Sequence, residues 1–153
     1  MNRLNVHLED ANSRKNVNSK EKQKIAQMAY DLIEPNMTVF LDISTTNIEL
    51  AKLLVLRPIS GITVVTNMLD VIQILSTSQI HSIFIGGEFD YARNGFVGNM
   101  CDEFLQRFHF DLAFLGVVGI DLESKSVMTY MPNDGQTKRI VLKQSKKAYM
   151  LAD

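Results

Sequence analysis

The sequence predicts an α/β fold, doubly wound, with a mostly parallel sheet and helices on both faces. Short apolar runs alternate along the chain with helix-like patterns. Runs such as Ile62-Thr-Val-Val-Thr66 and Ile83-Phe-Ile85 are apolar on both sides of the strand, as expected of a parallel sheet covered on each face. A chain of 153 residues that is 46% apolar also has the length and composition for one domain with a sizeable core.

The elements are predicted in order from the N-terminus. Residues 1–17 are polar and lack periodicity, which indicates an arm or linker, so the domain proper is expected to span residues 18–153. Asn18 and Glu21 resemble a capping box, which predicts a helix that ends at Pro35-Asn36. Beyond this turn we expect strands at 37–42, 62–66, 82–86, 111–117 and 147–152, helices at 47–55, 67–77, 97–108 and 134–144, a polar loop at 87–95 and a hairpin-like stretch at 119–131.

Composition excludes several classes of function. The net charge of -1 leaves no general field that would attract nucleic acid. No apolar stretch approaches the roughly 20 residues that span a bilayer, and the N-terminus lacks the apolar segment of a secretory signal. Cys101 is the single cysteine, which excludes an internal disulfide, indicates a small packing residue and fits the cytoplasm. The three histidines lack metal-ligand spacing, and the sequence implies no metal or other cofactor: His7, His81 and His109.

One junction has the residues to hold a phosphate. The apolar run from residue 38 ends in Asp42, and three hydroxyl side chains follow it: Ser44, Thr45 and Thr46. A helical pattern begins at Asn47, so the hydroxyls lie where a strand gives way to a helix. A helix N-terminus there would present free N–H groups and a partial positive charge to an anion. A helix cap without any ligand is equally compatible with these residues.

Other strand ends carry residues that suit the same ligand. Thr66-Asn67 follows the second strand, Gly86-Gly87 the third, and Gly116 the fourth. Ligands of open α/β sheets bind outside the carboxyl ends of the strands, so these positions should converge. Singly, each has a simpler explanation as a cap or a turn. Together they predict a site for a phosphorylated, polyhydroxylated molecule.

Asp134 and Lys138 lie four residues apart on the helix expected at 134–144. The simplest interpretation is a solvated ion pair on the helix surface. The alternative is that this helix covers the site, with Lys138 reaching the phosphate and Asp134 a sugar hydroxyl.

Taken in order, these residues resemble the C-terminal effector-binding domain of the DeoR family of bacterial transcriptional repressors. The resemblance covers residues 14–153, and two stretches look most like the repressors of sugar phosphotransferase systems such as the lactose system: residues 95–100 and 127–129. The motifs that carry it are Asn18, Lys22 and Ile25-Ala26, Asp42-Ile-Ser-Thr-Thr46, Val65-Thr-Asn67, Ile85-Gly-Gly87, Phe96-Val-Gly98, Phe114-Leu-Gly116, Gly119-Ile-Asp121, Asp134 with Lys138, and Leu151-Ala-Asp153.

The resemblance implies a Rossmann-like domain related to ribose-5-phosphate isomerase and CoA transferases, which binds a phosphorylated sugar and thereby alters DNA affinity. Ser44, Thr45 and Thr46 would hold the phosphate. Four residues would form the walls: Thr66, Asn67, Gly86 and Gly87. Three residues would recognise the hydroxyls and the charge of the sugar phosphate: Asp42, Asp134 and Lys138. The implied partners are the phosphorylated sugar, further copies of the chain in a homo-oligomer, and operator DNA through an N-terminal helix-turn-helix that this sequence lacks; no membrane partner is implied.

The sequence departs from the family pattern at three places. Ser44 replaces the usual glycine, which predicts strain if the loop needs a positive φ. Asp134 replaces the usual glutamate and reaches less far. The chain stops directly after Leu151-Ala-Asp153, so we expect a truncated C-terminus.

Two other functions remain as alternatives to a sensor. A sugar-phosphate isomerase would need paired acids, whereas Gly119-Ile-Asp-Leu-Glu123 offers only a loose Asp121 and Glu123. An oligomerisation module with a vestigial pocket is the other alternative, because Ser44 could spoil the phosphate loop. We expect a sensor and not an enzyme.

Overall fold

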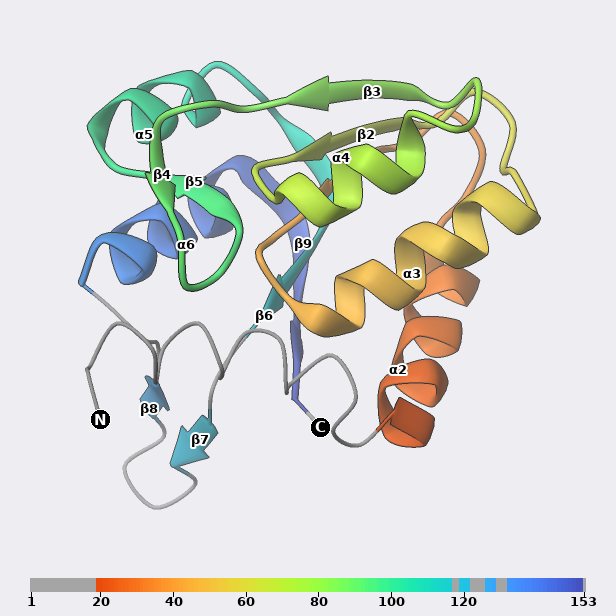
Figure 1. Ribbon diagram of the computed structural model, residues 1–153, viewed down its shortest axis with the longest axis horizontal. Coiled ribbons are helices and arrows are strands. Elements are labelled where there is room, and N and C mark those ends of the chain that lie inside the picture. The colour runs from red at the N-terminus through yellow and green to blue at the C-terminus, as the bar shows by residue number, and fades with distance from the viewer. Residues whose placement is uncertain (1–18, 117–118, 122–125, 129–131, 153) are drawn as a thin grey trace.

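The structure, a computed structural model, describes residues 19–116, 119–121, 126–128 and 132–152. Its centre is a five-stranded parallel sheet with the order β3-β2-β1-β6-β9 (Figure 1). The strands are β1 (Thr38–Leu41), β2 (Thr63–Thr66), β3 (His81–Phe84), β6 (Phe110–Gly116) and β9 (Ser145–Leu151). The chain winds outward from β1 to β3 and then returns to the other side of β1 with β6 and β9. The doubly wound α/β prediction is therefore confirmed, and the winding reverses between β1 and β6.

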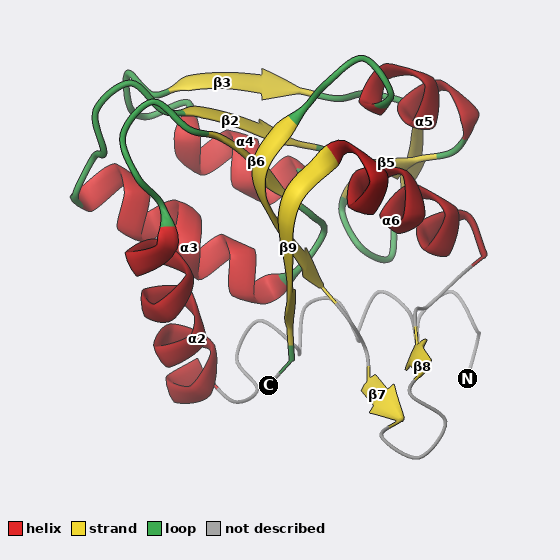
Figure 2. Ribbon diagram, turned by 180° about the vertical axis from the view of Figure 1, so that it is seen from behind, coloured by secondary structure: helices red, strands yellow, loops and turns green. Residues whose placement is uncertain are grey.

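Helices cover both faces of the sheet. The first face carries α2 (Ser19–Leu32), α3 (Thr45–Leu56) and α4 (Leu69–Leu75), and the second carries α5 (Asn99–Leu105) and α6 (Pro132–Gln144). Figure 2 shows α5 and α6 side by side, and α6 runs directly into β9 without a connecting residue. Strand side chains alternate between the faces: Val39 and Leu41 pack on the first, Phe40 on the second.

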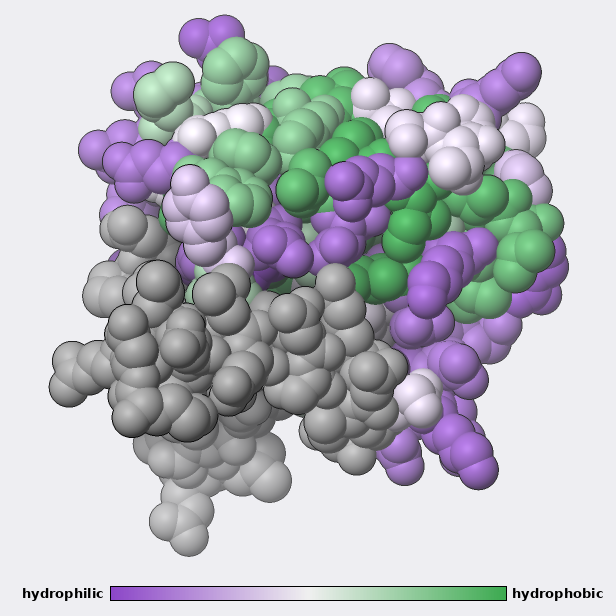
Figure 3. Space-filling model, viewed as in Figure 1, coloured by the Kyte–Doolittle hydropathy of each residue, from purple (hydrophilic) through white to green (hydrophobic). Residues whose placement is uncertain are grey.

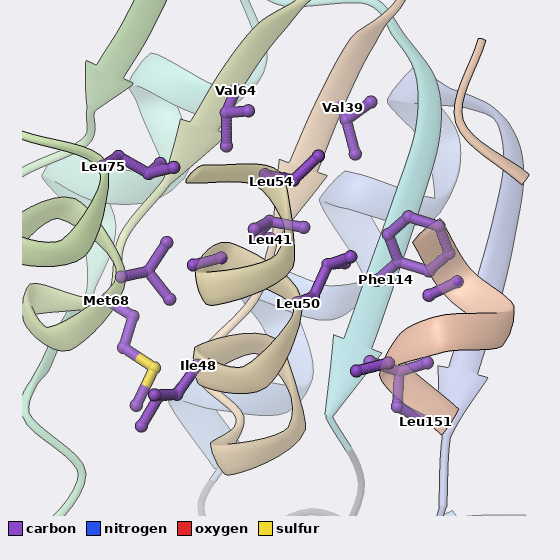
Figure 4. Packing of buried hydrophobic residues seen from close by; sticks show 14 of the residues in the cluster. Val39, Leu41, Ile48, Leu50, Leu54, Val64, Met68, Leu75, Phe114 and Leu151 are labelled. Carbon is purple, nitrogen blue, oxygen red and sulfur yellow. The ribbon is translucent and has the colours of Figure 1, made fainter. Parts of the chain in front are cut away.

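The larger core lies under α3 on the first face (Figure 4). Leu50 and Leu54 of α3 are fully buried and pack over the β1 side chains Val39 and Leu41. Truncating one of these leucines to alanine should cost about 2–5 kcal/mol of stability, because both the transfer free energy and the packing are lost. This face therefore fixes α3, and with it the strand-to-helix junction at its N-terminus.

The second core is smaller and joins α5 and α6 to the sheet. Phe40 and Phe110 meet with ring centroids 5.2 Å apart. Leu105 of α5 and Val141 of α6 are fully buried against the same cluster. The side chains of both helices therefore approach the sheet from the face opposite α3.

The prediction of a polar loop at 87–95 was wrong. This stretch contributes to an antiparallel hairpin of β4 (Glu88–Asp90) and β5 (Gly95–Val97). Phe89 and Phe96 face one another across it, with ring centroids 5.2 Å apart. Three residues with one aromatic between two acids are too short a run to establish a period of two, so the pairing with Phe96 reveals the strand. The hairpin predicted at 119–131 is confirmed for its described residues, where β7 (Gly119–Asp121) pairs antiparallel with β8 (Ser126–Met128).

The surface in Figure 3 shows apolar side chains gathered over α3 and α4 and polar side chains over α2. In the part of the chain that the structure describes, no helix combines the length and the hydropathy needed to cross a bilayer. The arm expected at residues 1–17 lies outside the described residues.

Candidate functional site

Asp42 lies at the point where the winding of the sheet reverses. It follows β1 directly, and its side chain is fully buried. Its Oδ2 accepts a hydrogen bond from the backbone N–H of Gly116, the last residue of β6, at 3.1 Å. The same oxygen accepts from the ammonium group of Lys138, which reaches it from α6. Ligands of doubly wound folds bind at this reversal, so the pair occupies the expected position for a site.

Lys138 is buried, with 5% of its surface exposed. The interpretation of Lys138 as one half of a solvated surface pair is therefore wrong, whereas the alternative, in which α6 covers the site, stays a prediction. A buried ion pair gives little net stability because both charges lose their hydration. Asp134 lies in the first turn of α6, and its side chain falls outside what the structure describes.

The hydroxyls after β1 form the cap of α3. Ser44 is the N-cap residue, and its Oγ accepts a hydrogen bond from the N–H of Thr46 at 3.2 Å. Its φ of -163° is extended backbone, so the strain expected from serine in place of glycine does not arise. The close approach is made by Gly116 instead, where an added Cβ would lie 2.7 Å from the Ile43 oxygen and from the Ser44 Cβ. Ser44 and Thr45 are half-buried, whereas Thr46 is buried.

Asn47 was not predicted as a site residue, yet it is fully buried beside Asp42. Its Nδ2 donates to the backbone oxygens of Asp42 at 2.9 Å and Phe114 at 3.0 Å, which ties β1 to β6. Its Oδ1 has no hydrogen-bond partner within the described residues. The sequence signal that would have identified this residue is an amide directly after three hydroxyls, at the start of a helix.

Thr66 and Asn67 differ in what they leave for a ligand. The Thr66 hydroxyl is buried; it donates to the Leu41 oxygen at 2.7 Å and accepts from the Met68 N–H at 3.1 Å. Asn67 is fully buried and donates through Nδ2 to the Phe96 oxygen at 2.8 Å. The Oδ1 of Asn67 has no partner in the described chain. Thr66 therefore supports the edge of the sheet, while Asn67 has a buried acceptor that no described group uses.

The two glycines after β3 also have different roles. Gly86 is exposed, and a Cβ added there would meet nothing within 4 Å. At Gly87 an added Cβ would lie 2.6 Å from the Val97 oxygen and 3.0 Å from the Cys101 Cβ. Gly87 therefore permits close packing against α5, and only Gly86 is open to an approaching molecule.

A family comparison identifies the chain. The model described as "DeoR C terminal sensor domain" matches residues 17–153. The chain belongs to this family of DeoR sensor domains. It is 33% identical over 141 residues to the lactose phosphotransferase system repressor of Lactococcus lactis subsp. lactis, covering 92% of this chain and 54% of that protein. It is 30% identical over 141 residues to the glycerol-3-phosphate regulon repressor of Escherichia coli K12, covering 92% and 55%. The sensor domain thus spans about half the length of these relatives.

The fold has a counterpart among enzymes. A D-ribose-5-phosphate isomerase solved in complex with phospho-erythronic acid matches 88% of the sensor domain and 52% of that chain, with a TM-score of 0.64 and 17% identity. At this identity the likeness shows the fold alone, as the sequence predicted. The similar full-length relatives are transcriptional regulators, so the domain is a sensor and not an enzyme. The lactose repressor is one of several relatives at comparable identity.

The sensor domain holds a second buried polar contact that the sequence did not reveal. Asp102 of α5 is 5% exposed, and Thr137 of α6 is fully buried. The Thr137 hydroxyl donates to Asp102 Oδ1 at 2.6 Å. Burial raises the pKa of Asp102, and the hydrogen bond from Thr137 partly opposes this rise. Each residue taken alone resembles an ordinary polar position on a helix, and the contact depends on how the two helices pack.

Cys101 is buried next to these groups, as its interpretation as a packing residue predicted. Burial, together with the negative charges of Asp102 and Asp42, raises the pKa of its thiol to about 12, although a hydrogen bond from Asn67 acts in the opposite direction. The thiol therefore stays protonated and is a poor nucleophile. Within the described ranges, no three His, Cys, Asp or Glu side chains gather as they would around a metal ion.

Proposed function

We propose that this sensor domain binds a phosphorylated sugar at the carboxyl edge of its sheet. The observation that carries the proposal is the buried pair of Asp42 and Lys138 at the reversal between β1 and β6, next to the N-terminus of α3. An ammonium group and a helix N-terminus both attract an anion. Their neighbourhood supports a ligand that carries a phosphate.

The acceptor groups support the sugar part of the ligand. Asn47 and Asn67 each hold a buried Oδ1 without a hydrogen-bond partner in the described chain, and Asp42 adds a carboxylate. Sugar hydroxyls are donors that would suit the Oδ1 atoms of the two asparagines. We assign Ser44, Thr45 and Lys138 to the phosphate, with the Thr46 amide contributing through the helix end. Asp134 remains proposed to contact a hydroxyl, Gly86 would line the site, and Thr66 and Gly87 would hold its shape.

The names of the relatives support the wider role. One is named as the repressor of a lactose phosphotransferase system and another as the repressor of a glycerol-3-phosphate regulon, so the two names between them contain a sugar and a phosphate ester. We therefore propose that the full-length protein is a cytoplasmic, oligomeric repressor of sugar genes. The ligand would favour one of two assembly geometries, and operator affinity would change with that population.

Thermal unfolding against a panel of pentose and hexose phosphates tests the proposal, with the matching unphosphorylated sugars and inorganic phosphate as controls. A ligand present at a hundredfold excess over its Kd adds about 2.7 kcal/mol and should raise Tm by about 5–10 °C. The absence of a shift with every phosphorylated sugar would overturn the sensor function for this domain and favour an oligomerisation module. NMR of the bound mixture should show no conversion of the sugar.

A variant locates the site. Thr45→Ala removes a half-buried hydroxyl assigned to the phosphate, and the loss of a charge-assisted hydrogen bond should weaken binding about tenfold or more. Thr77→Ala is the matched control, because that hydroxyl is exposed and bonds only the local Ile74 oxygen at 2.7 Å. Lys138→Ala should weaken binding further. Unchanged affinity in both Thr45→Ala and Lys138→Ala would contradict the site assignment.

A further inference from the structure

We infer that Asp102 and Thr137 are positioning residues that hold the Lys138 ammonium group at Asp42, an inference that rests on the proposed function of that site. Neither residue is assigned to the ligand. Their role is to fix the turn of α6 that carries Lys138.

The geometry of α6 carries the inference. Thr137 and Lys138 are adjacent, so their side chains leave the helix about 100° apart. Both are buried, while their neighbours Gln136 and Arg139 are exposed. Thr137 is held by α5 through Asp102, and Lys138 reaches the end of β1 through Asp42. The hydrogen bond of Thr137 and the ion pair of Lys138 point in different directions. Together they fix the rotation of this turn about the helix axis and its tilt relative to the sheet.

The chemistry of the contact also points beyond packing. A carboxylate with 5% of its surface exposed loses most of its hydration, and burial raises the pKa of Asp102 as a result. An apolar residue at position 102 would fill the same space without this cost. What Asp102 adds is a directed acceptor for one hydroxyl, at 2.6 Å from Thr137.

The two bonds also lie in one continuous structure. α5 and α6 pack side by side on the second face of the sheet (Figure 2). Gly87, between β3 and β4, packs closely against Cys101 in the turn of α5 that carries Asp102. The Thr137 anchor is therefore part of this packed layer, which would hold Lys138 in place before a ligand binds. Preorganisation of this kind improves affinity because less side-chain freedom is lost on binding.

The reactivity of lysine side chains tests the positioning without any ligand. The protein is treated with acetic anhydride, and mass spectrometry follows the acetylation rate of Lys138 against the exposed Lys143 on the same helix. Thr137→Val removes the hydroxyl and keeps the shape of the side chain. The acetylation rate of Lys138 should then rise about tenfold relative to that of Lys143, a change that corresponds to the free energy of one hydrogen bond. Thr137→Ser keeps the donor and should restore the slow rate.

A second substitution on the same helix separates positioning from general loosening. Val141→Ala opens the core under α6 without touching either polar bond. It should leave the relative rate of Lys138 near that of the wild type. If Val141→Ala raises this rate as much as Thr137→Val does, or if Thr137→Val leaves it unchanged, the positioning role is overturned. Should Thr137→Val fail to fold, Asp102→Ala removes the acceptor from the other partner and must give the same rise.

Titration with the sugar phosphate found in the thermal screen gives the second readout. Thr137→Val should raise Kd about tenfold, and Thr137→Ser should keep it within about twofold of the wild type. An unchanged Kd in Thr137→Val would contradict the role in binding. If the wild type binds no phosphorylated sugar, the proposed function fails, while the acetylation rates still decide whether Asp102 and Thr137 position Lys138.

Discussion

Each edge of the sheet has an ion pair between an aspartate and a lysine. The lysine at the amino edge is exposed to water, whereas the pair at the carboxyl edge is buried. At the amino edge, Asp111 of β6 accepts from the Thr38 N–H at 2.8 Å and lies 3.2 Å from Lys146, whose side chain is 79% exposed. At the carboxyl edge, Asp42 and Lys138 form their pair in the interior. The first carboxylate stabilises the start of a strand, and water screens its partner. The second is held where each charge depends on the protein for its solvation.

This difference shows that the carboxyl edge contains buried polar groups that the fold itself does not require. The carboxyl edge also holds the Oδ1 atoms of Asn47 and Asn67, buried and without hydrogen-bond partners in the described chain. A buried acceptor without a partner costs about 1–3 kcal/mol. An edge built for stability would resemble the amino edge. In the proposed function, these acceptors of the carboxyl edge would receive donors from the ligand.

Removal of one ammonium group at each edge should give the largest contrast. Lys138→Met leaves Asp42 buried without that partner and should cost about 3–5 kcal/mol in urea unfolding. Lys146→Met breaks an exposed pair and should cost about 0–1 kcal/mol. Equal losses in the two variants would refute the contrast between the edges.

Removal of a hydroxyl from each end of β2 should have a smaller effect. Thr66→Val leaves the Leu41 oxygen and the Met68 N–H without their hydrogen bonds to the Thr66 hydroxyl. It should lower the free energy of unfolding by about 1–3 kcal/mol. Thr63 lies at the amino end, is half-buried and contacts the His81 Nδ1 at 3.1 Å. Thr63→Val should change the free energy of unfolding by less than about 0.5 kcal/mol. A loss at Thr63 as large as that at Thr66 would show that the two ends are equivalent.

The pH dependence of stability should have opposite signs for two aspartates. The backbone N–H of Thr38 lowers the pKa of Asp111, so its stabilisation is present above the ordinary pKa of 3.8 and is lost as the pH falls through the lowered value. Burial raises the pKa of Asp102, so its stabilisation is present below 3.8 and is lost as the pH rises through the raised value. Urea unfolding between pH 3 and 7 measures both.

The quantity to compare is the unfolding free energy of the wild type minus that of each asparagine variant. This difference in unfolding free energy should increase with pH for Asp111→Asn and decrease with pH for Asp102→Asn. The same sign for both variants would contradict the assignment of Asp102 to a desolvated environment.

The smallest effect is expected at Ser44. Ser44→Gly keeps an acceptable cap residue in an extended conformation and should cost only a few tenths of a kcal/mol in thermal unfolding. Its effect on phosphate affinity is the sharper measurement, because the Thr46 N–H then loses its bond to the Ser44 Oγ. A large loss of stability would show that Ser44 does more than cap α3.

The sequence predicted the architecture well because local patterns determine it. Apolar runs marked β1 and β2 within a residue or two, and hydroxyls marked the start of α3, which begins at Thr45 rather than at 47. The helix expected at 97–108 is shorter, spanning Asn99–Leu105, because helix ends carry a weaker signal than helix centres. β4 and β5 were missed because their pairing is the only evidence for them.

The sequence named the residues of the proposed site, which stays a prediction, but it did not reveal the contacts among them. Asp42 and Lys138 were both named, yet 96 positions separate them, and local spacing suggested Asp134 as the partner of Lys138. Asp102 was missed, although it shares the buried side of α5 with Cys101 and Leu105. Contacts between elements depend on helix packing, which no pattern within one element encodes.

The direct junction between α6 and β9 limits how the length of this protein can vary. Gln144 ends the helix, Ser145 begins the strand, and the Gln144 amide donates to the Phe108 oxygen at 2.6 Å. One inserted residue would have to be absorbed by the helix, which rotates Lys138 by about 100° away from Asp42. Otherwise the strand must absorb it, which turns every side chain of β9 to the opposite face. Insertions and deletions at this junction should therefore be selected against as strongly as substitutions in the site itself.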